Sequence, residues 1–207
     1  MAGIPMMREP KQDRSRATRQ RLLEATIECL AEMGWAASTV AVVAERAGVS
    51  RGAAQHHFPT REELITAALE YIFDERMAQA LRDAKSAADI PGAQRTEAVV
   101  TRIVESYCGT FFKAALQVWT HASADPEMRR HIVPLEAKFG RMTHRLTIEA
   151  LGVDDSDPVT HQLVQATLDL ARGFGLADVL SDDSARRRPI VKQWARTLDA
   201  ALPTRPQ

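Results

Sequence analysis

The sequence predicts an all-α fold of about nine helices. Apolar residues recur at steps of three and four along most of the 207-residue chain, which is the spacing of one face of an α-helix. No segment shows the alternation of apolar and polar residues that a half-buried strand requires. No internal repeat is present, and prolines and glycines separate the helical patterns from one another.

The first long helical pattern ends near Gly34, and two short helices are expected after it. Ser38 or Thr39 can cap the first of them. Gly48 stands where this helix must end, because glycine adopts the left-handed conformation at little cost. Ser50 is a good N-cap for the second short helix, over residues 51–57. Pro59 cannot continue that helix, and Thr60 with Glu63 forms a capping box that begins the next one.

The second short helix is made of small and polar residues that would contribute little to a core. In a helix-turn-helix the second helix enters the DNA major groove, where small residues allow close approach and polar ones meet base edges. We therefore predict a groove-facing set and a phosphate-facing set, with an ordinary exposed helix as the alternative. The groove set is Arg51, Gly52, Gln55 and His56; the backbone set is Thr39, Ser50 and Arg61, with Thr60 beside them.

Residues from about 14 to 72 resemble the DNA-binding domain of the TetR family of bacterial repressors. Three motifs carry the resemblance: an amphipathic helix from Arg19 to Gly34, the run from Ser38 to Ser50, and the run from His56 to Leu64. The resemblance implies a homodimer formed through the last two helices. Gln55 departs from the family, which usually has a tyrosine there or one residue away, so the operator sequence cannot be carried over. Ala41 replaces a common polar residue, and Arg61 replaces a lysine.

Four parts are predicted along the chain. They are a flexible basic arm over residues 1–14, the helix-turn-helix domain over 15–60, a connecting helix over 61–84, and a larger helical ligand-binding and dimerisation domain over 85–207. The chain has 27 basic and 27 acidic residues, yet residues 1–61 hold nine basic against six acidic ones. This basic excess lies where DNA contact is predicted, and release of counter-ions would favour binding there.

The larger domain shows five further helices with recognisable breaks. A linker is expected over residues 88–93, Gly109 interrupts the second apolar series, and Asp125 with Pro126 begins the next helix, which ends at Gly152. The helices between Thr96 and Leu151 carry most of the remaining aromatic residues, so we expect them to enclose a cavity for a small ligand. Its predicted wall is Tyr107, Phe111, Trp119, Phe139 and Met142, and its polar anchors are Thr120 and His121. Each aromatic residue could instead belong to a closed core.

The last two helices are predicted to form the dimer interface. Apolar stripes run from Leu163 to Leu180 and from Ile190 to Leu202, and Trp194 makes the last helix more apolar than an exposed one requires. Gly173 and Gly175 lie inside a helix, where glycine is unfavourable by up to about 1 kcal/mol relative to alanine. Close approach by a partner helix would explain them, and packing within one subunit is the alternative.

We expect no catalytic residue, no cofactor and no metal site. No glycine-rich phosphate loop, nucleophile elbow or His-Glu-x-x-His motif is present. His121 and Asp125 have the spacing of a metal-binding pair but no evident third ligand. His144 is expected on a solvated face, and His131 and His161 receive no role. Cys29 and Cys108 lie on apolar stripes as reduced thiols. No signal peptide or run of about 20 apolar residues appears, so a cytoplasmic, non-membrane protein is expected.

The combined prediction is a ligand-responsive repressor. Its dimer would bind a palindromic double-stranded DNA operator, and a small apolar effector would release it. Two alternatives remain at this point: a DNA-binding dimer that needs no ligand, and an enzyme within the C-terminal helical domain.

Overall fold

The computed structural model describes residues 11–87 and 92–202, and this part of the chain contains nine helices and no strand. The predicted all-α class is therefore confirmed. The helices are α1 (Lys11–Ala37), α2 (Val40–Arg46), α3 (Arg51–His57), α4 (Arg61–Ala87), α5 (Gly92–Tyr107), α6 (Thr110–Ala124), α7 (Pro126–Leu151), α8 (Pro158–Ala177) and α9 (Ser184–Ala201). None of them is long and apolar enough to cross a membrane, within the described residues.

Two boundaries differ from the expected ones. Helix α1 begins at Lys11, so residues 11–14 are helical rather than part of an arm, and residues 1–10 lie outside the described residues. Helix α4 continues to Ala87 instead of ending near residue 84. Of the expected linker, residues 88–91 are outside the description, and Gly92 already belongs to α5.

The short-range signals place the helix ends as the sequence indicates. The Thr39 hydroxyl accepts a hydrogen bond from the Val42 N–H at 3.3 Å, and the Ser50 hydroxyl accepts one from the Ala53 N–H at 3.2 Å. Gly48 has a φ of 65° between these two helices. Thr39 is thus the N-cap of α2, which settles the choice that the sequence left open.

Similar signals organise the rest of the chain. Gly109 has a φ of 150° and separates α5 from α6. The Asp125 carboxylate accepts hydrogen bonds from the first N–H groups of α7, and Gly152 ends that helix with a φ of 68°. Gly34, with a φ of 76°, introduces a kink near the end of α1. The residue after this kink, Trp35, contacts other helices as described below.

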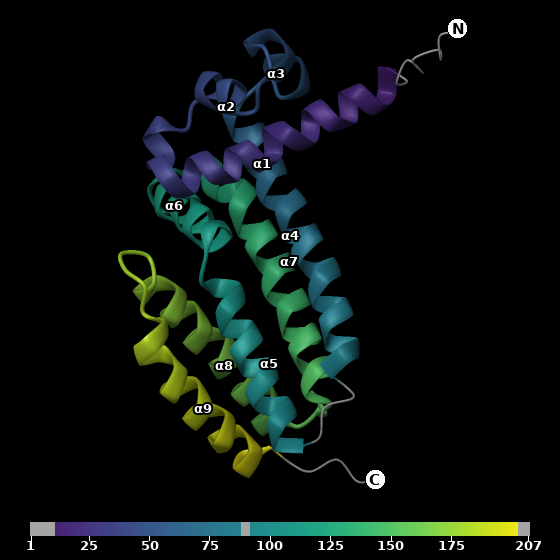
Figure 1. Cartoon of the computed structure of the whole chain (residues 1–207), viewed down its shortest axis with the longest axis vertical. Coiled ribbons are helices and arrows are strands. Elements are labelled where there is room, and N and C mark those ends of the chain that lie inside the picture. The colour runs from purple at the N-terminus through teal and green to yellow at the C-terminus, as the bar shows by residue number, and fades with distance from the viewer. Residues whose placement is uncertain (1–10, 88–91, 203–207) are drawn as a thin grey trace, which may run out of the picture.

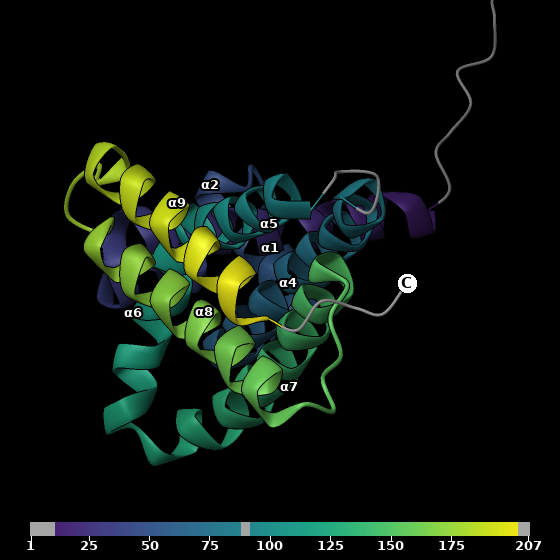
Figure 2. The same cartoon turned by 90° about the horizontal axis from the view of Figure 1, so that it is seen from below.

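The helices form two packed groups that share the long helices α4 and α7. In Figure 1, α1 crosses one end of the molecule with α2 and α3 above it, and α4 and α7 run side by side toward the other end. Helix α1 packs on α6 and α4, whereas α8 and α9 both pack on α5. Figure 2 shows α8 and α9 together on one flank.

One hydrophobic core joins the first three helices to the larger domain. Leu22, Leu30, Val43, Ala54 and Leu64 are buried in the same cluster as residues of α6 and α7. A second cluster unites α5, α8 and α9; it contains Val100, Val104, Ala171, Phe174, Val191, Ala195 and Leu198. The helix-turn-helix segment therefore has no separate core of its own.

The second cluster corrects part of the expected dimer interface. Leu198 has no exposed surface within one chain, and the Trp194 indole N–H donates to the Thr167 hydroxyl of α8 at 3.0 Å. These inward residues of the last two helices stabilise the single subunit, so assigning both stripes to a partner was wrong for them. The exposed face of α8 remains available.

The two glycines of α8 have different surroundings. A Cβ atom added at Gly175 would lie 2.5 Å from the Tyr107 carbonyl oxygen and 2.8 Å from the Phe112 ring. Gly175 is therefore explained by packing within the subunit. A Cβ atom at Gly173 would meet nothing within 4 Å. Close approach by a partner helix remains a prediction for Gly173 alone.

This difference predicts opposite effects of one substitution. Gly175→Ala should lower the free energy of unfolding by about 1–3 kcal/mol, because the backbone of α5 must shift to admit the methyl group. Measured in dilute, monomeric protein, Gly173→Ala is the matched control, and it should raise the free energy of unfolding by up to about 1 kcal/mol through helix propensity. Urea denaturation followed by circular dichroism measures both. Equal effects of the two substitutions would contradict this account.

Candidate functional sites: the second helix of the turn and an internal cavity

Helix α3 presents the predicted groove-facing residues on its open side. Arg51, Gly52, Gln55 and His56 are all exposed, and their spacing of one, three and four places them on one side of a two-turn helix. The opposite side carries Ala54, which is fully buried. The structure therefore brings these four residues together on a surface that the fold leaves uncovered.

The residues on the inner side of α3 hold the helix against α1. Phe58 is buried directly after the helix, and the Arg19 guanidinium of α1 lies 5.3 Å from the centre of its ring. His57 is half-buried, and burial together with the neighbouring His56 and Arg19 lowers the pKa of its imidazole. His57 therefore carries less positive charge near neutral pH than an ordinary surface histidine.

The three predicted hydroxyl residues lie at helix N-termini and are exposed. They are Thr39, Ser50 and Thr60, and each hydroxyl accepts a hydrogen bond from a backbone N–H of the helix that it caps. A capping hydroxyl still has its own proton to donate. These residues can therefore contact phosphate oxygens without giving up their caps.

Arg61 lies differently from the prediction. Its guanidinium stacks over the Trp35 ring at 4.4 Å and donates to the Trp35 carbonyl oxygen, while its Nε is buried without a partner. Burial lowers the pKa of Arg61 from its ordinary value. The side chain is turned toward the end of α1, so its phosphate contact stays a prediction that would require it to leave Trp35.

A cavity of about 860 Å³ lies in the larger domain, among helices α4, α5, α6 and α7. Four of the predicted wall residues line it: Tyr107, Phe111, Trp119 and Phe139. Phe73 of α4 stacks on Phe139 of α7, with ring centres 3.5 Å apart. The volume and the aromatic lining match a site for a small organic molecule.

The other three predicted residues lie outside this cavity. Thr120 is exposed and bonds to the Leu116 carbonyl of its own helix. His121 stacks on Trp35 with ring centres 3.9 Å apart and pairs with Asp125 at 3.4 Å. Met142 is half-buried beside Arg145 on α7. These three side chains do not line the cavity, so their predicted ligand contacts have no support from its geometry.

The polar groups that do line the cavity were missed in the sequence. Arg172 of α8 lies 3.5 Å from the Glu136 carboxylate of α7, and its Nε is buried without a hydrogen-bond partner. Arg76 donates to the Ser106 carbonyl and lies 5.0 Å from the Phe111 ring. Their position could have been predicted from the sequence. Each of Arg76, Glu136 and Arg172 lies three or four residues from a buried apolar residue of the same helix, and so on its inward face.

Burial changes the protonation of these groups. It raises the pKa of Glu136, which the neighbouring Arg172 opposes, and it lowers the pKa of Arg76. Burial also raises the pKa of Tyr107, so that its hydroxyl stays protonated. The cavity thus offers hydrogen-bond donors within an apolar wall.

The sequence comparison matches the first part of this architecture. Residues 22–68, which run from α1 through α3 into α4, match the model of bacterial regulatory proteins of the tetR family. The chain therefore carries a segment of the tetR-family model. Its first part is the helix-turn-helix domain of that family, and the open face of α3 described above belongs to the second helix of the motif.

A curated relative and two solved structures extend the comparison. The transcriptional regulator CymR of Pseudomonas putida is 31% identical over 128 residues, which cover 60% of this chain and 61% of CymR. The match thus spans about three fifths of that relative. A transcriptional regulator from Rhodococcus sp. Rha1 superimposes with a TM-score of 0.66 at 20% identity, covering 91% of this chain and 99% of its own.

The second structure is a regulator from Saccharomonospora viridis in complex with choline. It has a TM-score of 0.60 and 21% identity, over 91% of this chain and 100% of its own. At these identities the structural likeness shows the fold, and that fold extends over both the helix-turn-helix and the larger helical domain.

The position of Arg61 gives a prediction that separates a structural role from a phosphate contact. Arg61→Ala should lower the free energy of unfolding by about 1–2 kcal/mol, because it removes the stacking on Trp35 and a charged hydrogen bond. It should leave the salt dependence of DNA binding unchanged. Arg51→Ala is the comparison: because Arg51 lies on the groove-facing side of α3, it should relax the base preference by about 1–3 kcal/mol at the contacted base pair. A flattened slope with unchanged stability for Arg61→Ala would restore the phosphate role.

Proposed function

We propose that this TetR-family protein is a transcriptional repressor that acts on DNA in the bacterial cytoplasm. The observation that carries the proposal is the open face of α3 with Arg51, Gly52, Gln55 and His56 inside the family's helix-turn-helix. Arginine and glutamine are suited to bidentate contacts with guanine and adenine in the major groove. The curated relative is named as a regulator, which favours this role over an enzyme in the helical domain.

We propose that the repressor is a homodimer formed by α8 and α9. Residues at steps of three and four along α8 leave an exposed face that includes Val159, Gly173 and Leu176, and Leu180 follows it with 94% of its surface exposed. Ile190 adds an exposed apolar residue on α9. A two-fold axis on this flank would relate two copies of α3, and each copy would enter the major groove of one half-site of a palindrome.

A charge on this face should prevent dimer formation. Leu176→Glu should give a folded monomer that no longer binds the palindrome, because dimerisation would bury an unpaired carboxylate. Leu176 is 58% exposed in the single chain, so the fold should tolerate the change. Val133→Glu is the matched control, because Val133 on α7 is 55% exposed and lies off this face. Sedimentation velocity gives the answer; a dimeric Leu176→Glu protein would exclude this interface.

We propose that the effector binds in the cavity and is an apolar, partly aromatic or acyl molecule with one polar end. The aromatic residues would contact its apolar part, and the unpartnered Nε of Arg172 would donate to the polar end. Arg172 is already paired with Glu136 and Asp169, so the preference for an accepting or anionic group rests on its unpartnered Nε. The choline bound by the Saccharomonospora viridis regulator makes a cation the alternative to test.

Effector binding should stabilise the protein and release DNA. A molecule at 100 times its dissociation constant should add about 2.7 kcal/mol to the free energy of unfolding. The probes are medium-chain fatty acids, aromatic carboxylates and choline, tested by thermal shift and then by release of a selected operator. Arg172→Gln should weaken the best anionic probe by about 10- to 100-fold, since a charged hydrogen bond is lost.

Glu136→Gln is the matched control for that experiment, because it changes the other member of the same ion pair. It should weaken a cationic probe but leave an anionic one bound. Probes that stabilise the protein without releasing DNA would favour a DNA-binding dimer that needs no ligand. If Gln55→Ala no longer prefers the selected operator over other DNA, then α3 makes the base contacts of the complex that the effector releases.

A further inference from the structure

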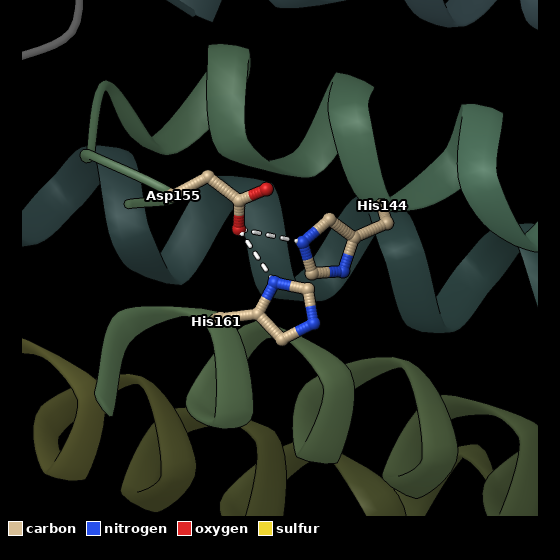
Figure 3. A group of neighbouring side chains, drawn as sticks. All are labelled: His144, Asp155 and His161. Carbon is tan, nitrogen blue, oxygen red and sulfur yellow. Dashed lines mark hydrogen bonds and ion pairs between the residues drawn. The ribbon is translucent and has the colours of Figure 1, made fainter. Parts of the chain in front are cut away.

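Three side chains with metal-binding atoms meet between α7 and the start of α8. His144 lies on α7, Asp155 lies in the loop between α7 and α8, and His161 lies in the first turns of α8 (Figure 3). The Asp155 Oδ1 atom is 2.8 Å from His144 Nε2 and 3.0 Å from His161 Nδ1. One ligand atom from each residue lies within 4.8 Å of the other two.

The arrangement differs from an ordinary surface ion pair. A single carboxylate oxygen faces both imidazole rings, whose centres are 4.5 Å apart. The His144 side chain is only 12% exposed, so one ligand is held by packing, while the His161 side chain is 54% exposed and leaves the site accessible. The loop is anchored at both ends, by Gly152 at the end of α7 and by Asp157 at the start of α8.

The donor set has the chemistry of a transition-metal site. Two imidazole nitrogens and one carboxylate oxygen suit Zn²⁺, which binds them at about 2.0–2.2 Å in a tetrahedral arrangement. Ligand atoms at those distances are separated by about 3.3 Å along a tetrahedral edge. The observed 2.8 and 3.0 Å therefore need to open by only a few tenths of an ångström.

Metal binding at this site is compatible with neutral imidazole rings on His144 and His161. In the metal-free protein, each ring nitrogen that faces Asp155 can donate a proton to it, and these hydrogen bonds hold the pKa of Asp155 below its ordinary value. A neutral imidazole can carry its proton on the other nitrogen instead. Metal binding thus needs a change of tautomer at His144 and His161 rather than a new charge.

The surroundings leave one coordination position for another group. The hollow beside the cluster is lined by Arg141, Arg145 and Gln165, and the Arg145 guanidinium lies 3.6 Å from Glu149. With two arginines nearby, a bound dication gains most from an anion such as hydroxide or chloride in the fourth position. A site of three protein ligands with one open position is the usual form of an accessible zinc site.

We propose that His144, Asp155 and His161 form a three-ligand binding site for a divalent transition-metal ion, with zinc as the best match. This departs from the expectation that the chain has no metal site, because the sequence separates the third ligand from the first by a loop. The bound ion would join α7, which lines the effector cavity, to α8, which carries the proposed dimer face. The site itself does not depend on the proposed repressor function.

The test uses the full chain after treatment with a chelator. Zinc chloride is titrated in by calorimetry, and cobalt chloride is titrated in a parallel experiment that follows visible absorption. We expect one ion per chain, a higher melting temperature with zinc, and the intense absorption of tetrahedral cobalt. His161→Ala should weaken zinc binding at least about tenfold, because even loss of a residue that only supports a ligand has that effect.

Two further variants make the result decisive. Asp155→Asn can keep hydrogen bonds to both rings but loses the anionic ligand, so it should fold normally and bind zinc at least about tenfold more weakly. His131→Ala is the matched control, because His131 is an exposed histidine of α7 away from the cluster. Absence of saturable zinc binding, or the same zinc affinity in His161→Ala as in the wild-type chain, would overturn the proposal.

Discussion

The structure depends on one continuous core that the helix-turn-helix shares with the larger domain. Leu22, Leu30 and Val43 of the first helices are buried in the same cluster as Val118 of α6 and Ile132 of α7. Interiors packed to this density transmit displacements instead of absorbing them. The position of α3 is set by α2 and α1, and α1 packs in turn on α6 and α4. A change in α6 or α4 that displaces α1 must therefore move α3 or strain the core.

Trp35 is the side chain through which the ends of α1 and α4 contact α6. It follows the kink at Gly34, stacks on His121 of α6, and contacts the Arg61 guanidinium at the start of α4. The ends of α1 and α4 thus meet α6 on a single side chain. Because α6 also carries Phe111 and Trp119 in the cavity wall, a molecule in the cavity that displaced α6 would act on α1 and α4, and through α1 on α3. His121 belongs to this junction and does not line the cavity.

The features that the sequence predicted are those decided by short-range interactions. The caps at Thr39, Ser50 and Asp125 depend on hydrogen bonds within three residues, and the ends at Gly48 and Gly152 depend on one backbone conformation. The roles that it did not predict depend on contacts between distant segments. Gly173 and Gly175 are equivalent as a sequence pattern, yet only the latter faces the backbone of α5. The aromatic wall was predictable, but its charged partners came from α4, α7 and α8.

Helix α7 lies between the cavity and the proposed metal site, and this constrains how the two can influence each other. Phe139 and Thr143 line the effector cavity, His144 faces the proposed metal site, and Gly140 borders both hollows. A rotation of α7 that widens one hollow must alter the other, because the helix is packed between α4 and α8. If the two ligands prefer different positions of α7, each changes the affinity of the other by the same factor, since coupling between binding equilibria is reciprocal. Under the proposed function, metal binding would then shift the effector concentration at which the protein leaves DNA, through a helix outside the helix-turn-helix.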